Sequence, residues 1–171
     1  LSEMGVSVRY TNERIEGGEP VADIRIMLNE DLKAIDVPAE RVPSMIDEFP
    51  ILSVIAACAE GTTKMTGLAE LRVKESDRLA LVAKGLQDCG VDLEVGEDTL
   101  TIHGKGKPPN GGANIKTSLD HRIAMSFLIL GSTTPEPVKI DDISPAATSF
   151  PGFVDMMNDL GTNITAFHAG E

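Results

Sequence analysis

The sequence contains few aromatic and few basic residues, and both shortages narrow its range of functions. It has no Trp and one Tyr among 171 residues, so it offers few platforms on which nucleic-acid bases can stack. Its 15 Lys and Arg residues are outnumbered by 27 Asp and Glu residues, which gives a formal net charge of −12. A chain of this charge repels nucleic acid and anionic membrane surfaces, and we expect neither as a partner.

Long apolar segments and secretory signals are also lacking. The longest apolar run, 123–130, is interrupted by Ser126 and falls well short of the roughly 20 residues that a membrane-spanning helix needs. No signal-peptide pattern opens the chain. The two cysteines, Cys58 and Cys89, lie in apolar helical patterns and are predicted to be core thiols. These features predict a protein of the reducing cytoplasm.

The sequence has no recognisable metal or nucleotide motif. Its three histidines, His103, His121 and His168, lack the spacing of metal ligands, and neither cysteine has a second ligand nearby. The Gly- and Pro-rich stretch 105–112 lacks the Gly-Lys-Ser/Thr of a phosphate-binding loop, and no Gly-x-Ser-x-Gly is present. We therefore expect no bound metal.

A repeated pattern runs along the chain and predicts its fold class. A helix end followed by a strand occurs three times, with a glycine at each junction: Gly5, Gly90 and Gly161. A second similar stretch begins at Asp47 and again, 73 residues later, at Asp120. Strands alternate with helices throughout, so we predict an α/β (α+β) fold of repeated units with pseudo-symmetry.

Local patterns place the individual elements. Apolar alternation bounded by turn residues predicts strands, and apolar residues at helical spacing behind capping residues predict helices. The predicted strands are 6–10, 23–28, 34–37, 63–66, 91–95, 99–103, 114–117 and 138–141. The predicted helices are 47–61, 76–89, one capped by Asp120 and one opened by 149–151, whose buried face is Phe153, Met156, Met157 and Leu160. The stretch 1–5 resembles the last turn of a helix whose body is missing, which predicts that the chain is a fragment.

The segment 72–78 is the strongest candidate for chemistry. Arg72, Lys74 and Arg78 lie within seven positions at the start of a predicted helix, where free N–H groups favour anions. Lys74 and Arg78 suit phosphate or carboxylate. Glu75 would weaken a pure anion site, so its presence predicts proton transfer. The alternative is a solvated charged turn with pairs such as Glu75–Arg78.

Two further positions are weaker candidates on their own. Asp120-His121-Arg122 opens a predicted helix, and Arg122 can present a guanidinium at its positive end. The alternative is an N-cap followed by two surface residues, and a lone His121 is more often structural. Asp47 is predicted to cap the helix 47–61 in the same way.

Three motifs together resemble a known family. Arg72-Val-Lys-Glu-Ser-Asp-Arg78, Leu119-Asp-His-Arg-Ile-Ala-Met125 and Thr148-Ser-Phe-Pro151 are similar to C-terminal motifs of the 5-enolpyruvylshikimate-3-phosphate (EPSP) synthases. The resemblance extends over most of the chain from about Ile35 onward. Asp47-Glu-Phe-Pro and the last two motifs resemble the class II bacterial enzymes, which are known for glyphosate tolerance.

The resemblance implies a transferase of aromatic amino-acid (chorismate) biosynthesis. Such an enzyme moves the enolpyruvyl group of phosphoenolpyruvate to the 5-hydroxyl of shikimate 3-phosphate and releases phosphate, without a metal or organic cofactor. The implied fold has two domains, each of three βαβαββ-type units around a pseudo-threefold axis. This chain would supply most of one domain, with units at roughly 1–70, 71–143 and, in part, 144–171. The N-terminal part of the enzyme, possibly a separate chain, would be its partner, and the fragment alone is expected to be inactive.

The resemblance also implies individual roles. Asp47 would take the proton from the 5-hydroxyl, and Glu75 would handle the proton at the methylene carbon. Lys74 would contact both substrates. The phosphoenolpyruvate ligands would be Arg78 and Arg122, with His121 beside them.

Two positions depart from the family pattern. Thr148 stands where many members have a lysine, and Glu70 stands where others have an Asn that binds the shikimate phosphate. The contacts at both positions are therefore open.

Two rival functions remain. One is the sister enolpyruvyl transferase that acts on UDP-N-acetylglucosamine, which shares the fold and reaction but is not expected to contain the 72–78 string. The other is a non-catalytic anion-binding domain, which would have no use for carboxylates at Asp47 and Glu75.

Overall fold

The computed structural model describes residues 1–28 and 31–166, and its elements alternate between strands and helices. The strands are β1 (Val6–Glu16), β2 (Glu19–Leu28), β3 (Asp36–Val37), β4 (Glu60–Met65), β5 (Asp92–Val95), β6 (Leu100–Lys105), β7 (Asn114–Ile115) and β8 (Lys139–Ile140). The α-helices are α1 (Val42–Met45), α2 (Phe49–Cys58), α3 (Arg78–Asp88), α4 (His121–Gly131), α5 (Ala146–Ser149) and α6 (Phe153–Asp159). The 3₁₀ turns are η1 (Ser2–Met4), η2 (Ala39–Arg41), η3 (Ile46–Glu48) and η4 (Leu68–Val73). No helix within these described residues is long and apolar enough to cross a membrane.

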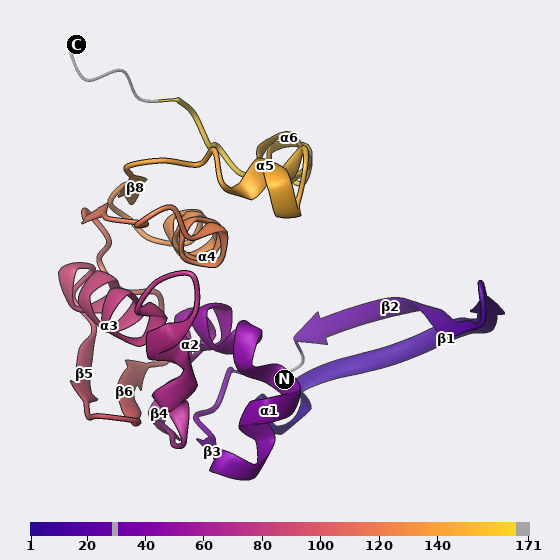
Figure 1. Cartoon of the computed structure of the whole chain (residues 1–171), viewed down its shortest axis with the longest axis horizontal. Coiled ribbons are helices and arrows are strands. Elements are labelled where there is room, and N and C mark those ends of the chain that lie inside the picture. The colour runs from indigo at the N-terminus through magenta and orange to yellow at the C-terminus, as the bar shows by residue number, and fades with distance from the viewer. Residues whose placement is uncertain (29–30, 167–171) are drawn as a thin grey trace.

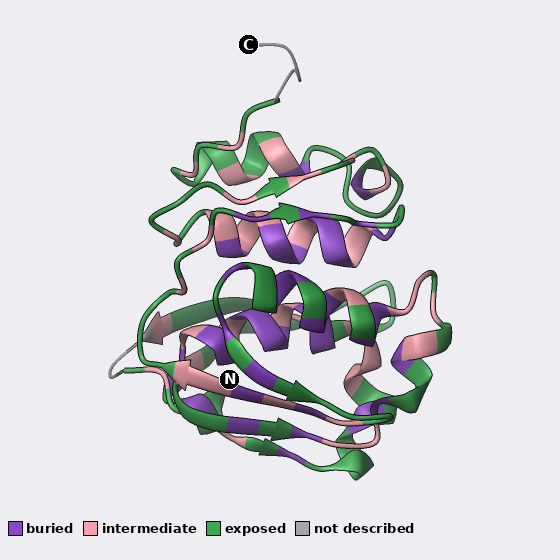
Figure 2. Cartoon of the chain, turned by 90° about the vertical axis from the view of Figure 1, so that its left-hand side faces the viewer, coloured by how far each residue is buried: buried purple, intermediate pink, exposed green. Residues whose placement is uncertain are grey.

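The elements stack in layers (Figure 2). A four-stranded sheet has the order β3-β4-β6-β5, in which β3 and β4 are parallel and the other neighbours antiparallel. Helices α2 and α3 pack on this sheet, α4 packs on both helices, and the short parallel pair β7–β8 lies beyond α4. The predicted mixed α/β architecture is confirmed.

The core lies between the sheet and helices α2, α3 and α4. The apolar positions predicted for α3 are all buried there: Leu79, Val82, Ala83, Leu86 and Cys89. The helix begins two residues later than predicted, because Asp77 is its N-cap and accepts a hydrogen bond from the Ala80 N–H. Burial raises the pKa of the Cys89 thiol to about 11, as expected for a core thiol. Cys58, predicted to be a second core thiol, is only half-buried.

The three junction glycines all adopt a left-handed backbone. Their φ angles are 92° at Gly5, 86° at Gly90 and 102° at Gly161, a region that L side chains rarely enter. Gly5 is followed by β1 and Gly90 by β5, as the repeat predicts. The prediction of a strand after Gly161 is wrong, since the structure assigns no strand between Thr162 and Ala166. A strand needs a hydrogen-bonded neighbour, and the described chain places none beside this stretch.

The predicted cap at Asp47 is also wrong. Asp47 lies within η3, and the N-cap position of α2 is Glu48, which makes no side-chain cap. Pro50, in the first turn as predicted, has no N–H for a cap to bind. The Asp47 carboxylate instead accepts a hydrogen bond from Arg78.

The last helix differs from the prediction in its start and in its buried face. α6 begins at Phe153, after the left-handed Gly152. Phe153 is buried and packs edge-on against Phe150, with ring centroids 5.7 Å apart. Met156 and Leu160 are 38% and 73% exposed, because nothing in the described chain covers their side of the helix.

The β1–β2 hairpin projects away from the layers (Figure 1). Its strands are longer than predicted, and the register pairs Val8 with Ile26 and Tyr10 with Ile24 on one face. Tyr10, Ile24 and Ile26 are each more than half exposed. An alternating strand with one apolar face is typical of a sheet covered on that side, and an isolated hairpin is only marginally stable in water.

The packing of α3 on α4 predicts a stability change at Gly85. A methyl group at Gly85 would lie 2.3 Å from Cζ of the buried Phe127 ring. Gly85→Ala should therefore destabilise the chain by about 1–3 kcal/mol, although alanine gains about 1 kcal/mol of helix propensity. Denaturant unfolding measures the difference. The exposed Gln87→Ala in the same helix is the control and should be near neutral. A Gly85→Ala variant as stable as the parent chain would contradict the packing.

Candidate active site

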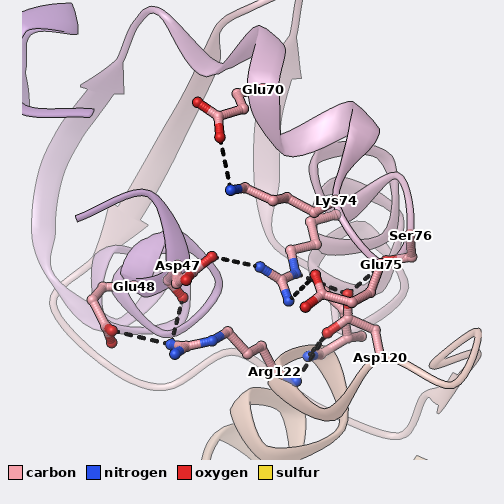
Figure 3. A network of polar contacts seen from close by, with 10 residues as sticks. Asp47, Glu48, Glu70, Lys74, Glu75, Ser76, Asp120 and Arg122 are labelled. Atoms are coloured by element: carbon pink, nitrogen blue, oxygen red, sulfur yellow. Dashed lines mark hydrogen bonds and ion pairs between the residues drawn. The ribbon is translucent and has the colours of Figure 1, made fainter. Parts of the chain in front are cut away.

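Charged residues from three segments meet where helices α2, α3 and α4 begin (Figure 3). Asp47 and Glu48 come from η3, the turn before α2. Arg78 is the first residue of α3, and Arg122 is the second residue of α4. The helix starts that the sequence predicted separately are therefore neighbours in space.

Arg78 is the centre of this cluster. Its side chain is 1% exposed, yet three carboxylates surround its guanidinium. Nε donates to Asp120 Oδ2 at 2.8 Å, and Nη1 donates to Asp47 Oδ1 at 2.8 Å. Nη2 forms an ion pair with Glu75 Oε2 at 2.6 Å that lacks hydrogen-bond geometry, which leaves Nη2 without a hydrogen bond among the described residues.

The carboxylates keep this buried guanidinium charged. Burial alone lowers the pKa of Arg78, but Asp120, Glu75 and Asp47 outweigh burial and raise the pKa above its ordinary value. Burial likewise acts to raise the pKa of Asp120, but hydrogen bonds from Arg78 and Ser76 outweigh it and lower that pKa. Both groups therefore remain ionised as a pair.

Asp120 has a second role that the sequence did not reveal. As predicted, it caps α4: Oδ1 accepts hydrogen bonds from the N–H groups of Arg122 and Ile123. Its other oxygen accepts from Arg78 and, at 2.8 Å, from the Ser76 hydroxyl. The side chain is fully buried. A cap residue followed by His-Arg was the only signal, and it gives no hint of an ion pair to a residue 42 positions away.

Arg122 joins the cluster through Asp47. Its Nη1 donates to the Asp47 carbonyl at 2.8 Å and to Glu48 Oε1 at 3.0 Å. Asp47 therefore binds Arg78 through its side chain and Arg122 through its backbone. Glu48 is a further member that the sequence reading missed.

The remaining predicted residues lie at the edge of the cluster or outside it. Lys74 pairs with Glu70 at 2.7 Å, and this hydrogen bond raises the pKa of Lys74. His121 is half-buried and begins α4, next to Arg122. Thr148 is exposed in α5 and donates to the Pro145 carbonyl instead of joining the network. Within the described residues no group of three or more possible ligands could hold a metal ion.

The cations of the site already have partners within the chain. Lys74, Arg78 and Arg122, the cations predicted to bind anions, are all paired with carboxylates of the chain. Arg78 itself is buried, whereas the Glu75 and Asp47 side chains that pair with it are 54% and 46% exposed. The alternative of a solvated charged turn does not describe this site. Its Glu75–Arg78 pair is present, but Arg78 is buried.

Comparison with known proteins identifies the family. Residues 1–157 match the family model described as "EPSP synthase (3-phosphoshikimate 1-carboxyvinyltransferase)". The chain belongs to the EPSP synthase family. It is 59% identical to the 3-phosphoshikimate 1-carboxyvinyltransferase of Cereibacter sphaeroides over 97% of its length and 37% of that protein. It is 58% identical to the Rhodospirillum rubrum protein of the same name over 96% of its length and 36% of that protein. The chain thus spans little more than a third of these EPSP synthases.

Solved structures agree with the family assignment. An EPSP synthase from Acinetobacter baumannii superimposes with a TM-score of 0.92 at 46% identity, over 98% of this chain and 39% of that one. The enolpyruvyl transferase NikO from Streptomyces tendae gives a TM-score of 0.72 over 96% of this chain and 34% of that one. At 22% identity it supports the fold alone.

The Arg78–Asp120 pair predicts a large stability effect. Asp120→Asn keeps a side chain that can cap α4 but leaves a buried guanidinium short of a carboxylate, which should cost about 3–5 kcal/mol. Asp77→Asn is the matched control, because Asp77 also caps a helix and pairs with an arginine, Arg72, but is 42% exposed. It should cost less than about 1 kcal/mol. Denaturant unfolding compares the two, and equal costs would contradict the buried pair.

The same comparison should depend on pH. The folded-state pKa of Asp120 is lowered, so its carboxylate contributes stability that is fully present above the unfolded value of about 3.9. This contribution is lost as the pH falls from there through the folded pKa. The difference between the parent chain and Asp120→Asn should therefore shrink below about pH 4.

Proposed function

We propose that this chain is part of an enzyme that transfers the enolpyruvyl group of phosphoenolpyruvate to the 5-hydroxyl of shikimate 3-phosphate and releases phosphate. Family membership supports this reaction, which is the one that the relatives' name describes. The main structural support is that four residues lie together at three helix starts: Asp47, Glu75, Arg78 and Arg122. The two carboxylates can move protons, and the two arginines can bind anions.

The geometry suits an addition followed by an elimination. In the first step the 5-hydroxyl oxygen bonds to C2 of phosphoenolpyruvate while the C2–C3 double bond opens; Asp47 takes the hydroxyl proton, and Glu75, in its protonated form, gives a proton to the methylene carbon. In the second step the bond between C2 and the phosphate oxygen breaks, Glu75 takes the proton back from the new methyl group as the double bond re-forms, and the leaving phosphate takes up the proton held by Asp47. Both carboxylates contact the same guanidinium, Asp47 at Nη1 and Glu75 at Nη2, so Arg78 places the two groups relative to each other.

The cations of the cluster are proposed to bind the anionic groups of the substrates. Arg78 and Arg122 are proposed to bind phosphoenolpyruvate, and Lys74 to contact both substrates. His121 lies beside Arg122 and is proposed as a further substrate contact. When the anions enter, they take the places of Glu75 and Glu48 on the two arginines, which keeps each guanidinium paired throughout.

The rival functions are less well supported. The sister reaction on UDP-N-acetylglucosamine would need a different acceptor site, and the relatives at more than half identity are named for the shikimate substrate. A non-catalytic anion binder has no use for Asp47 and Glu75, which compete with any anion for Arg78. A binding assay in which shikimate 3-phosphate competes with UDP-N-acetylglucosamine distinguishes the proposed function from the sister reaction.

The rest of the enzyme is the proposed partner of this chain. We place residues 1–171 in most of one domain, with repeat units at roughly 1–70, 71–143 and, in part, 144–171. Two exposed apolar surfaces, the Tyr10–Ile24–Ile26 face of the hairpin and the Met156–Leu160 side of α6, are suited to contact it. A cytoplasmic location stays a prediction.

The chain alone should therefore show no turnover of phosphoenolpyruvate and shikimate 3-phosphate. Catalysis in a cleft depends on groups held together by both parts of the enzyme, since positioning supplies much of the rate. Mixing the chain with the remaining part should restore phosphate release. Full activity of the 171 residues alone would contradict the proposal.

In the complete enzyme, Glu75→Gln should lower kcat by about 10²–10⁴-fold, which is the usual size of a general acid–base contribution. The amide keeps the shape but cannot carry the proton. Binding of shikimate 3-phosphate, measured by calorimetry, should change little. A kcat that stays within a few-fold would assign Glu75 a structural role only.

Arg122→Lys in the complete enzyme should raise the KM for phosphoenolpyruvate strongly and the KM for shikimate 3-phosphate weakly. The lysine keeps the charge but loses the planar fork, and losing such a contact costs about 2–5 kcal/mol. Arg9→Lys, on the exposed hairpin, is the control and should change little. Steady-state kinetics with each substrate varied decides; equal rises in both KM values would indicate a general loss of cleft closure.

A further inference from the structure

Arg72 belongs to the basic segment but makes contacts outside the Arg78 cluster. Its Nε donates to the Glu97 carbonyl at 2.6 Å and its Nη2 to the Gly96 carbonyl at 2.7 Å. Its Nη1 donates to Asp77 Oδ2 at 3.0 Å. All three guanidinium nitrogens are therefore used within the chain, and the proposed substrate contacts leave Arg72 without a role.

These contacts connect two distant parts of the fold. Gly96 and Glu97 form the turn between β5 and β6, which the Gly96 N–H closes by bonding the Thr99 carbonyl at 2.9 Å. Asp77 is the N-cap of α3 and accepts a hydrogen bond from the Ala80 N–H at 2.9 Å. Arg72 thus connects the turn between β5 and β6 to the start of α3, the helix that begins with Arg78.

The segment between these anchors bears the proposed catalytic groups. Residues 74–76 lie between Arg72 and Asp77 and belong to neither a helix nor a strand. Their side chains nevertheless point to three different partners: Lys74 to Glu70, Glu75 to Arg78 and Ser76 to Asp120. Because residues 74–76 have no regular backbone hydrogen bonds of a helix or strand, the conformation of this segment depends on the residues that flank it.

We propose that Arg72 is a positioning residue that holds Lys74 and Glu75 in place by pinning both ends of their segment, an inference that rests on the proposed function. Its pair with Asp77 is 30% and 42% exposed, so the attraction between the charges contributes little by itself. The contribution is geometric. Three acceptors in three directions match the fork of an arginine, whereas a lysine has one nitrogen and can satisfy them only in part.

The test begins with Arg72→Lys in the complete enzyme. We expect kcat to fall by about 10–100-fold, because a displacement of about 1 Å in a reacting group costs up to about 10²-fold. The midpoint of thermal unfolding should change little. Arg41→Lys is the matched control: Arg41 makes a two-pronged pair with Glu3, at 2.8 Å for each contact, outside the cluster. It should leave kcat unchanged.

A double-mutant comparison separates positioning from general stability. If Arg72 acts through Glu75, then Arg72→Lys should cost far less in a Glu75→Gln background than in the wild type, because the group it positions is already disabled. A purely structural role predicts the same fold-loss in both backgrounds. Equal losses, or a kcat for Arg72→Lys within about twofold of the wild type, would overturn the proposal.

Hydrogen exchange gives a readout that does not need activity. In the complete enzyme, Arg72→Lys should speed amide exchange at Arg78 and Ala80, whose N–H groups bond Ser76 and Asp77, while leaving α4 unchanged. Unchanged exchange at Arg78 and Ala80 would overturn the proposal, whereas an unchanged kcat for Glu75→Gln would contradict the proposed function instead. If Arg72→Lys does not fold, Asp77→Asn breaks the same pair and keeps the α3 cap, and the same criteria apply to it.

Discussion

The buried guanidinium of Arg78 is the interaction on which the rest of the site depends. It joins the three helix starts, since Asp47 precedes α2, Glu75 precedes α3 and Asp120 caps α4. Burying an arginine costs several kcal/mol of hydration, and a well-packed apolar residue would often give a more stable fold. Its presence in the core is therefore better explained by what it positions than by the stability it adds. Two of its three carboxylates are half-exposed and replaceable, and the third, Asp120, is fully buried.

The cations that are proposed to bind anions in this acidic chain are all paired with its own carboxylates. Five carboxylates and three cations make up the cluster, so each cation already has a partner. We propose that an anionic substrate replaces a carboxylate and does not add to an unpaired positive patch, which would attract any polyanion. In the proposed mechanism this displacement also frees Glu75 for proton transfer. Arg72 lies outside the cluster, and its contacts with the turn between β5 and β6 are proposed to hold the irregular segment 74–76 in place.

Local patterns in the sequence predicted much of the fold but less of the site. Apolar spacing located α3 to within two residues, and the glycine repeat marked turns that do require a left-handed backbone. The pairing of Arg78 with Asp120 spans 42 positions, and no local pattern indicates it. Asp47 was a plausible cap by residue type, but Arg78 competes for its carboxylate. The structure places Asp47, Glu75, Arg78 and Arg122 close together, and their roles stay predictions.

The most direct test is a crystal structure of the complete enzyme with phosphoenolpyruvate and shikimate 3-phosphate, or an unreactive analogue, bound. We expect a ligand oxygen within hydrogen-bond distance of Arg78 Nη2, with Glu75 displaced from it and the Nε contact to Asp120 unchanged at about the usual 2.8 Å of a charge-assisted bond. A complex in which Arg78 keeps Asp47, Glu75 and Asp120 while both ligands bind elsewhere would contradict it.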